Sequence, residues 1–338
     1  MRILLFFLVS SPLLLFASTY AELAKEILDG FETKQINSPY AKELFENVRQ
    51  VTKDFTDHPS FIELERFVPR IYLEYMAFHF VKTRPNARIA LIWPETKGHD
   101  EEIHREFNKY FNIQMYKRIL LDKQGALNFL DTFPNISSDD HYEFLFAFDK
   151  YKDVPLRVFL LDGDPEKIHE CRKNMRCMVY FTKDHADTVE LAKTVFNQNS
   201  IHCIKNRIRD SQDKHKIISL HHAEDVIFTS ESVLYAYGNI TPSSFRCFSK
   251  ETPLNYTSDR EELYTLSQTP MIYSNIGFNR YGTTKRTLTT DDLLHNPRYH
   301  FFFRGVKFTT PEATLFIESI LPSKNSALIS EKIKQIEL

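Results

Sequence analysis

Glycine and tryptophan are scarce in this chain, and strongly apolar segments are missing beyond its N-terminus. Eight glycines and one tryptophan occur among 338 residues. The sequence contains neither G-x-G-x-x-G nor G-x-x-x-x-G-K-[ST], the glycine-rich loops that cradle phosphate groups with backbone N–H. After the N-terminal apolar run, no segment is long and apolar enough to cross a bilayer. These absences exclude the common phosphate-loop enzymes and a chain that crosses a membrane several times.

An excess of charge of one sign is missing too. The formal net charge is -2 at pH 7, from 43 Lys and Arg against 45 Asp and Glu. No global basic surface is therefore available to bind nucleic acid through counterion release, and we expect no nucleic-acid partner. With 42% hydrophobic and 26% charged residues, the composition is that of a folded globular protein. The length indicates two domains, or three small ones.

The N-terminus, "MRILLFFLVSSPLLLFASTYA", has an arginine, an apolar core and then small residues. This three-part layout predicts a secretory signal peptide over residues 1–21 with cleavage near Ala21. The apolar core is short for a bilayer of roughly 30 Å, although an uncleaved N-terminal anchor is the alternative. We therefore expect a secreted or periplasmic protein that has no membrane contact after cleavage.

Four cysteines follow in the exported part: Cys171, Cys177, Cys203 and Cys247. An oxidising compartment permits disulfides, and a bridge between Cys171 and Cys177 is one interpretation. Buried thiols are the other interpretation. The spacing contains no pair of C-x-x-C motifs, so it does not indicate a zinc site.

The pattern of apolar residues divides the rest of the chain into three parts. Residues 22–83 have helical spacing, and residues 84–206 alternate between short apolar strands and helices of about ten residues, the pattern of an α/β domain. The polar run 205–216 is the predicted linker, and residues 217–338 are the third part. The expected fold class is α/β, with α+β as the alternative.

The stretch "VFLLDGDPEKIHE" contains the first candidate site. Asp162 and Asp164 follow an apolar strand, as in the D-x-D of metal-dependent glycosyltransferases, where the acids bind Mn²⁺. The competing interpretation is structural, because Asp164 followed by Pro165 and Glu166 is a strong helix start.

A second candidate is "YFTKDHADTVELAK", where a predicted strand meets a helix. His185 is a candidate catalytic residue, since helix N-termini frequently host catalytic groups. Asp184 and Asp187 would repel an anionic ligand there, and both suit capping of the helix instead.

Four stretches together resemble bacterial nucleotidyltransferase-like proteins associated with surface polysaccharide synthesis: "VFLLDGDPEKIHECRKNMR", "HADTVELAKTVFNQNSIHCI", "VLYAYG" and "DDLLHNPRYHFFFRGVKFTTPEA". The resemblance runs from Leu156 to about Leu315 and implies an α+β nucleotidyltransferase-like domain over residues 217–338. It also implies a metal-binding acidic pair on the strand after Tyr237-Gly238. This sequence has "NITPSSFRCF" there, so no catalytic residue carries over.

Two functions remain open on the sequence alone. The first is an exported, non-catalytic protein on this degenerate scaffold that binds a glycan, a surface polymer or another protein and needs no cofactor. The second is a nucleotidyl- or glycosyltransferase that holds Mg²⁺ or Mn²⁺ at Asp162 and Asp164, or at displaced acids such as Asp291 and Asp292. At the last two residues helix capping again competes, with Thr290 or Asp291 as the predicted cap.

Overall fold

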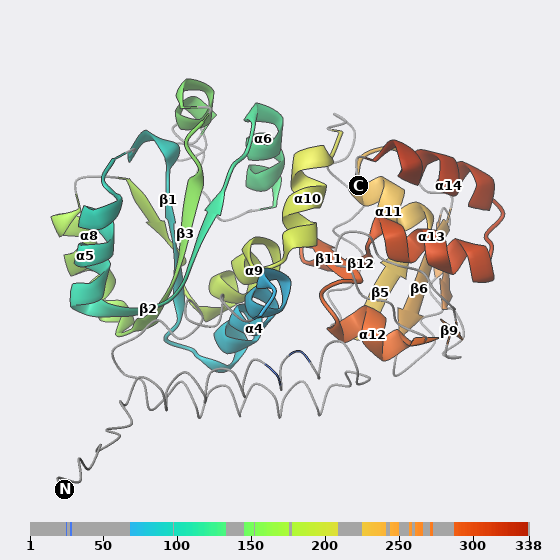
Figure 1. The fold of residues 1–338 in the computed structure, drawn as a ribbon, viewed down its shortest axis with the longest axis horizontal. Helices are drawn as coiled ribbons and strands as arrows, with labels where there is room; N and C mark the ends of the chain where they lie inside the picture. Colours follow the sequence, from blue (N-terminus) through green and yellow to red (C-terminus); the bar gives the residue numbers. More distant parts are fainter. Residues whose placement is uncertain are drawn as a thin grey trace, which may run out of the picture.

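The structure is a computed structural model, and it describes most of the chain from residue 68 onward. The described ranges are 68–96, 98–132, 145–151, 153–175, 178–208, 225–240, 244–249 and 287–336, with Lys25, Leu28 and the strand backbones of 257–258, 261–265 and 271–272. The predicted signal peptide, Cys177 and most of the predicted linker lie outside these residues. The described part is a mixed α/β structure, as expected, with two sheet-containing units side by side (Figure 1).

The first unit is built on a four-stranded sheet in the order β2-β3-β1-β4. Its strands are β1 (Arg88–Ile92), β2 (Phe111–Ile119), β3 (Leu156–Gly163) and β4 (Val179–Phe181). Every neighbouring pair is antiparallel, and β3 lies between β1 and β2. This is a split β-α-β arrangement, in which the two strands joined by a helix are separated by a third strand.

Helices cover both faces of this sheet, which explains why β1 and β3 read as continuous apolar runs. Ile89 and Leu91 of β1 face the core with α4 (Arg70–Thr83), α6 (Lys123–Asp131) and α9 (His185–Val195). Ala90 and Ile92 face a second core with α5 (Asp100–Tyr110) and α8 (Ile168–Asn174). Figure 1 shows the two sets of helices on opposite sides of the sheet.

The spacing of apolar residues in "HADTVELAKTVFNQNS" predicts one helix, and this prediction is wrong, because two helices occupy the stretch. α9 ends at Val195, and α10 (Gln198–Asn206) begins after Asn197. Asn197 is extended, and its side chain accepts a hydrogen bond from the amide of Ser200 at 2.9 Å. A side-chain cap of this kind starts a new helix in a new direction.

β3 also fixes the loop that joins β1 to α5, through the buried guanidinium of Arg157. It donates to the carbonyl oxygens of Trp93 at 3.1 Å and Thr96 at 3.2 Å, and also to the Thr96 hydroxyl and the Asp100 carboxylate. The loop contains the short helix η1 (Pro94–Thr96). Because the arginine is paired with both carbonyls and a carboxylate, its burial is compensated.

The second unit contains a mixed sheet in the order β11-β12-β5-β6-β8-β7. Its well-packed elements are β5 (Val226–Thr229), α11 (Glu231–Ala236), β6 (Ser244–Ser249), α12 (Thr290–His295), β11 (His300–Phe303), β12 (Val306–Thr309), α13 (Pro311–Ile320) and α14 (Ser326–Gln335). The strands β7 (Thr257–Ser258) and β8 (Glu261–Thr265) complete the sheet, and β9 (Met271–Ile272) pairs separately with β10 (Thr287–Leu288). Arg304 and Gly305, both at positive φ, form the two-residue turn between β11 and β12, as tight hairpins require.

A buried ionic group ties α4 to β2. Glu74 is fully buried and accepts from Lys117 Nζ at 2.6 Å and from Arg70 Nε at 3.0 Å. The Lys117 ammonium also donates to the Val195 carbonyl oxygen at 2.7 Å, so it connects β2 to the end of α9 as well. Burial lowers the pKa of Lys117, and the charge of Glu74 opposes that shift.

We expect Lys117→Met to lower the free energy of unfolding by about 3–5 kcal/mol, because the substitution leaves the buried Glu74 without its closest cation. The double variant Glu74→Leu/Lys117→Met should recover most of this loss, since it removes both buried charges. Urea unfolding of the two variants measures the difference. A loss below about 1 kcal/mol in the single variant would mean that the pair behaves like a solvated surface pair.

Candidate functional site

The structure places Asp162 and Asp164 at the end of β3, where only one of the two carboxylates caps a helix. Asp162 lies opposite Asn112 of β2 and is partly buried. Burial raises the pKa of its carboxyl, and the charge of Arg84 opposes the rise. Asp164 caps the short helix η2 (Pro165–Lys167), as predicted, by accepting from the Glu166 amide at 3.0 Å. Only Asp162 therefore keeps a carboxylate that no helix cap uses.

His185 occupies the first position of α9 and points toward α4. Its Nε2 lies 2.9 Å from the Val81 carbonyl oxygen, to which the ring donates. Asp184 caps the helix, as predicted, by accepting from the Asp187 amide at 2.8 Å. Asp187 in turn accepts from the Tyr180 hydroxyl and the Lys183 amide, each at 2.9 Å. This group fixes the start of α9 against β4 and α4.

The predicted cap of α12 is wrong by one or two residues, because Thr289 caps this helix. Thr289 and Asp292 form a capping box: the Thr289 side chain accepts from the Asp292 amide at 3.2 Å, and the Asp292 carboxylate accepts from the Thr289 amide at 3.0 Å. Asp291 lies beside it in the first turn. The strand that precedes the helix is extended at Thr289, and a residue with this backbone is the one that caps.

The sequence-predicted acids therefore lie in different units, at the end of β3 and in the first turn of α12. Within the part of the chain that the structure describes, no group of three or more His, Cys, Asp or Glu side chains could hold a metal ion. Cys171, Cys203 and Cys247 are buried thiols, and the predicted partner Cys177 lies outside the described residues.

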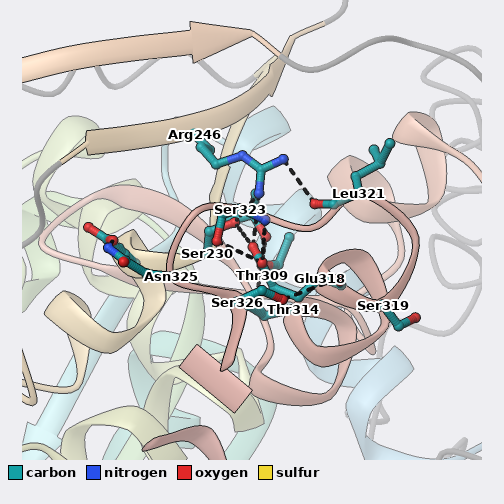
Figure 2. A network of polar contacts seen from close by, with 12 residues as sticks. Ser230, Arg246, Thr309, Thr314, Glu318, Ser319, Leu321, Ser323, Asn325 and Ser326 are labelled. Atoms are coloured by element: carbon teal, nitrogen blue, oxygen red, sulfur yellow. Dashed lines mark hydrogen bonds and ion pairs between the residues drawn. The ribbon is translucent and has the colours of Figure 1, made fainter. Parts of the chain in front are cut away.

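A polar group that the sequence did not reveal lies in the second unit, around Ser230 (Figure 2). Ser230 is the single residue between β5 and α11, and its backbone has φ 63° and ψ -129°. A non-glycine residue in this region carries strain of order 1–3 kcal/mol, which the surrounding structure must sustain. Such strain is often stored at functional sites, and so the group around Ser230 is the strongest candidate.

Glu318 of α13 is the centre of this group. It is 2% exposed and accepts from the Ser230 hydroxyl, from Arg246 Nη1 at 2.9 Å, and from the Ser323 amide and hydroxyl at 2.9 and 2.8 Å. Arg246 of β6 also donates to the Ser230 hydroxyl oxygen at 3.2 Å and to the Leu321 carbonyl oxygen at 3.0 Å. One carboxylate thus joins β5, β6, α13 and the loop before α14.

The backbone around Ser230 has the shape of a nucleophile elbow, a sharp strand-to-helix turn that presents a serine. The sequence signal of that motif, G-x-S-x-G, is missing from Thr229-Ser230-Glu231, and for this reason sequence reasoning overlooked it. The serine is 1% exposed, and its hydroxyl is held by a carboxylate and a guanidinium. In this arrangement the hydroxyl joins secondary-structure elements, and no imidazole is among its hydrogen-bond partners in the described residues.

α11, which begins directly after Ser230, ends at the turn Tyr237-Gly238, the turn on which the resemblance to nucleotidyltransferase-like proteins depends. Gly238 has φ 74° and closes the helix, with its amide donating to the Tyr235 carbonyl oxygen at 2.9 Å. A Cβ there would lie 1.8 Å from the Ile208 carbonyl oxygen, so glycine is required for packing as well. β6 follows, and the residue that it directs at Glu318 is Arg246.

Comparisons with known proteins give no relative for this chain. No protein-family model matches it, and no curated protein or solved structure matches it.

We expect Ser230→Gly to be more stable than Ser230→Ala by about 1 kcal/mol or more, because both lose the hydroxyl and only glycine relieves the positive φ. Ser232, two residues on inside α11, provides a matched control. There Ser232→Ala should be more stable than Ser232→Gly by about 1 kcal/mol, since alanine is the better helix former. Denaturant unfolding of the four variants tests this. If the alanine variant were the more stable one at both positions, the claim that the Ser230 backbone is strained would be contradicted.

Proposed function

We propose that this chain is an exported binding protein that recognises a glycan, a surface polymer or another protein, on a nucleotidyltransferase-like scaffold that lacks the metal-binding acids. The single observation that carries the proposal is Arg246. It stands on the strand after Gly238, where the resemblance implies metal-binding carboxylates, and its guanidinium is bound to Glu318. A guanidinium has no acceptor atom to offer a metal ion, and here it is already paired with a carboxylate, which opposes two-metal chemistry at this place.

The local roles of the acids support the same proposal. Asp164, Asp184 and Asp292 each accept a hydrogen bond from a backbone amide at a helix start. Glu318 is bound by Ser230, Arg246 and Ser323. A carboxylate committed to backbone and side-chain donors is a poor ligand for a metal that must be released and rebound with a substrate.

A surface suited to a partner lies at the helical residues 145–150 and the start of α6. Phe146 is 65% exposed and Leu120 is 51% exposed, and the ion pair between Lys123 and Asp149, at 3.6 Å, joins the two segments. Lys150 lies over the Phe146 ring, 5.6 Å from its centroid. A solvated aromatic ring with charged groups around it is typical of the anchors in recognition surfaces.

The alternative function is a transferase that holds Mg²⁺ or Mn²⁺ at Asp162 and Asp164. One observation favours it: Asp162 lies partly buried at the end of the central strand β3, and burial raises the pKa of its carboxyl. Partly buried carboxyl groups with a shifted pKa are candidates for functional sites.

A thermal-shift screen with oligosaccharides, nucleotides and nucleotide sugars, each with and without Mg²⁺ or Mn²⁺, separates the two functions. Ligand binding to the folded state raises the melting temperature by linkage. We expect a shift with an oligosaccharide that needs no metal, or no shift with any of these compounds if the partner is a protein. A metal-dependent shift with a nucleotide that disappears in Asp162→Asn would support the transferase and contradict the proposal.

For the ligand found, or for a protein partner captured from the natural source, we expect Phe146→Ser to weaken binding by about tenfold or more, as loss of an anchor residue does. The stability should stay within about 0.5 kcal/mol, because the ring is exposed. Leu328→Ser, at another exposed apolar residue on α14, is the control and should leave the affinity unchanged. Equal affinity of the Phe146→Ser variant, measured by calorimetry, would place the binding surface elsewhere.

A further inference from the structure

The two units meet along β11, and histidine and aromatic rings line this contact. The His300 ring lies 5.7 Å from Tyr75 of α4 and 5.5 Å from Phe302, between ring centroids. Phe302 lies 5.7 Å from Phe78, and His79 lies 4.5 Å from Tyr75. Two histidines, one from each unit, thus share one aromatic contact.

The His300 ring is held in its neutral form by its surroundings. Its Nδ1 lies 3.0 Å from the Leu293 carbonyl oxygen, which can only accept, so Nδ1 carries the proton. The Nε2 atom is buried and has no hydrogen-bond partner among the described residues. A second proton would therefore place a charge in this buried contact, and burial opposes that charge more strongly than the backbone carbonyls of Leu293 and Asn296 favour it.

The charged groups that act most strongly on the two rings have the same sign as a protonated histidine. Burial lowers the pKa of both His79 and His300 well below its usual value, and Lys307 of β12 and His295 of α12 lower both further. Lys82 of α4 also lowers the pKa of His79.

The partners of these neighbours fix their positions. The Lys307 ammonium donates to the Leu294 carbonyl oxygen at 3.0 Å and lies 5.5 Å from the Phe302 ring centroid. The acids of α12, Asp291 and Asp292, are in its first turn, and Asp292 is engaged in the capping box. α10 faces β11 with Asn197, Asn199 and Ser200, which are uncharged.

We propose that the contact of β11 with α4 and α10 is an acid-sensitive joint: protonation of His300, together with His79, opens the contact between the two units while the first sheet stays folded. The direction follows from linkage. Both rings are neutral in the closed state and regain an ordinary pKa of about 6.5 when the joint opens, so the open state binds more protons. The closed state is fully favoured above about pH 6.5 and loses its advantage as the pH falls below that value, by about tenfold per pH unit for each histidine.

Hydrogen exchange at two amides of the intact protein tests this proposal. The Phe302 amide donates to Ser200 Oγ at 2.8 Å across the joint, and the Thr182 amide donates to the Ile89 carbonyl oxygen at 3.0 Å inside the first unit. Between about pH 7.5 and pH 5.5, after correction for intrinsic exchange, the opening constant at Phe302 should rise by at least about tenfold. The constant at Thr182 should change by less than about threefold.

Three variants assign the effect. His300→Gln keeps a donor for the Leu293 carbonyl but does not titrate. In this variant the opening constant at Phe302 should therefore rise less steeply as the pH falls, by about a factor of ten less per pH unit below about pH 6.5. His79→Gln should reduce it as well, and His169→Gln, at an exposed histidine on α8, should leave it unchanged. Exchange at Phe302 that is independent of pH, or that changes in parallel at Thr182, overturns the proposal. Should His300→Gln fail to fold, the wild-type exchange and His79→Gln decide the question by themselves.

Discussion

The edge of β11 that has no neighbouring strand is the constraint on which the arrangement of the two units depends. β11 is an end strand of the six-stranded sheet, and an end strand presents unpaired N–H and C=O groups on one side. Side chains of α10 satisfy them: Asn199 donates to the His300 carbonyl oxygen at 3.3 Å, and Ser200 Oγ accepts from the Phe302 amide at 2.8 Å. The helix thus acts as a substitute for a further strand. It belongs to the first unit, and so the two units are joined by hydrogen bonds as well as by apolar packing.

The break between α9 and α10 makes this possible. A single helix through residues 185–206 would carry the Asn and Ser side chains away from β11, and the cap at Asn197 turns the chain so that they face it. Asn197 contributes twice, because its side chain accepts from Ser200 and donates to the His300 carbonyl oxygen at 3.3 Å. Local capping and the contact between units therefore depend on the same residue.

Buried charges recur where elements distant in sequence meet. Glu74 joins α4 to β2, Arg157 joins β3 to the loop after β1, and Glu318 joins α13 to β5 and β6. Each is paired and hydrogen-bonded, and removal of one partner from such a group costs several kcal/mol. A buried paired charge tolerates few alternative arrangements, which favours one packing of these elements. In the proposed joint around His300, by contrast, the two buried imidazoles are neutral, and the proposal is that they gain a charge when the pH falls.

Several features were determined by the sequence alone, because their causes lie within a few residues. The strands β1 and β3, the caps at Asp164 and Asp184 and the mixed α/β class follow from local apolar patterns and from side chains that reach the next amides. Only the tertiary structure decided the antiparallel order of the first sheet, the positive φ of Ser230 and the roles of Arg246 and His300. Nothing within Thr229-Ser230-Glu231 requires a left-handed serine, and that conformation is sustained by Glu318, a residue that lies far away in the sequence. The pattern of strands does not fix the pairing either: apolar runs buried on both faces are typical of parallel sheets, yet every neighbouring pair in the first sheet is antiparallel.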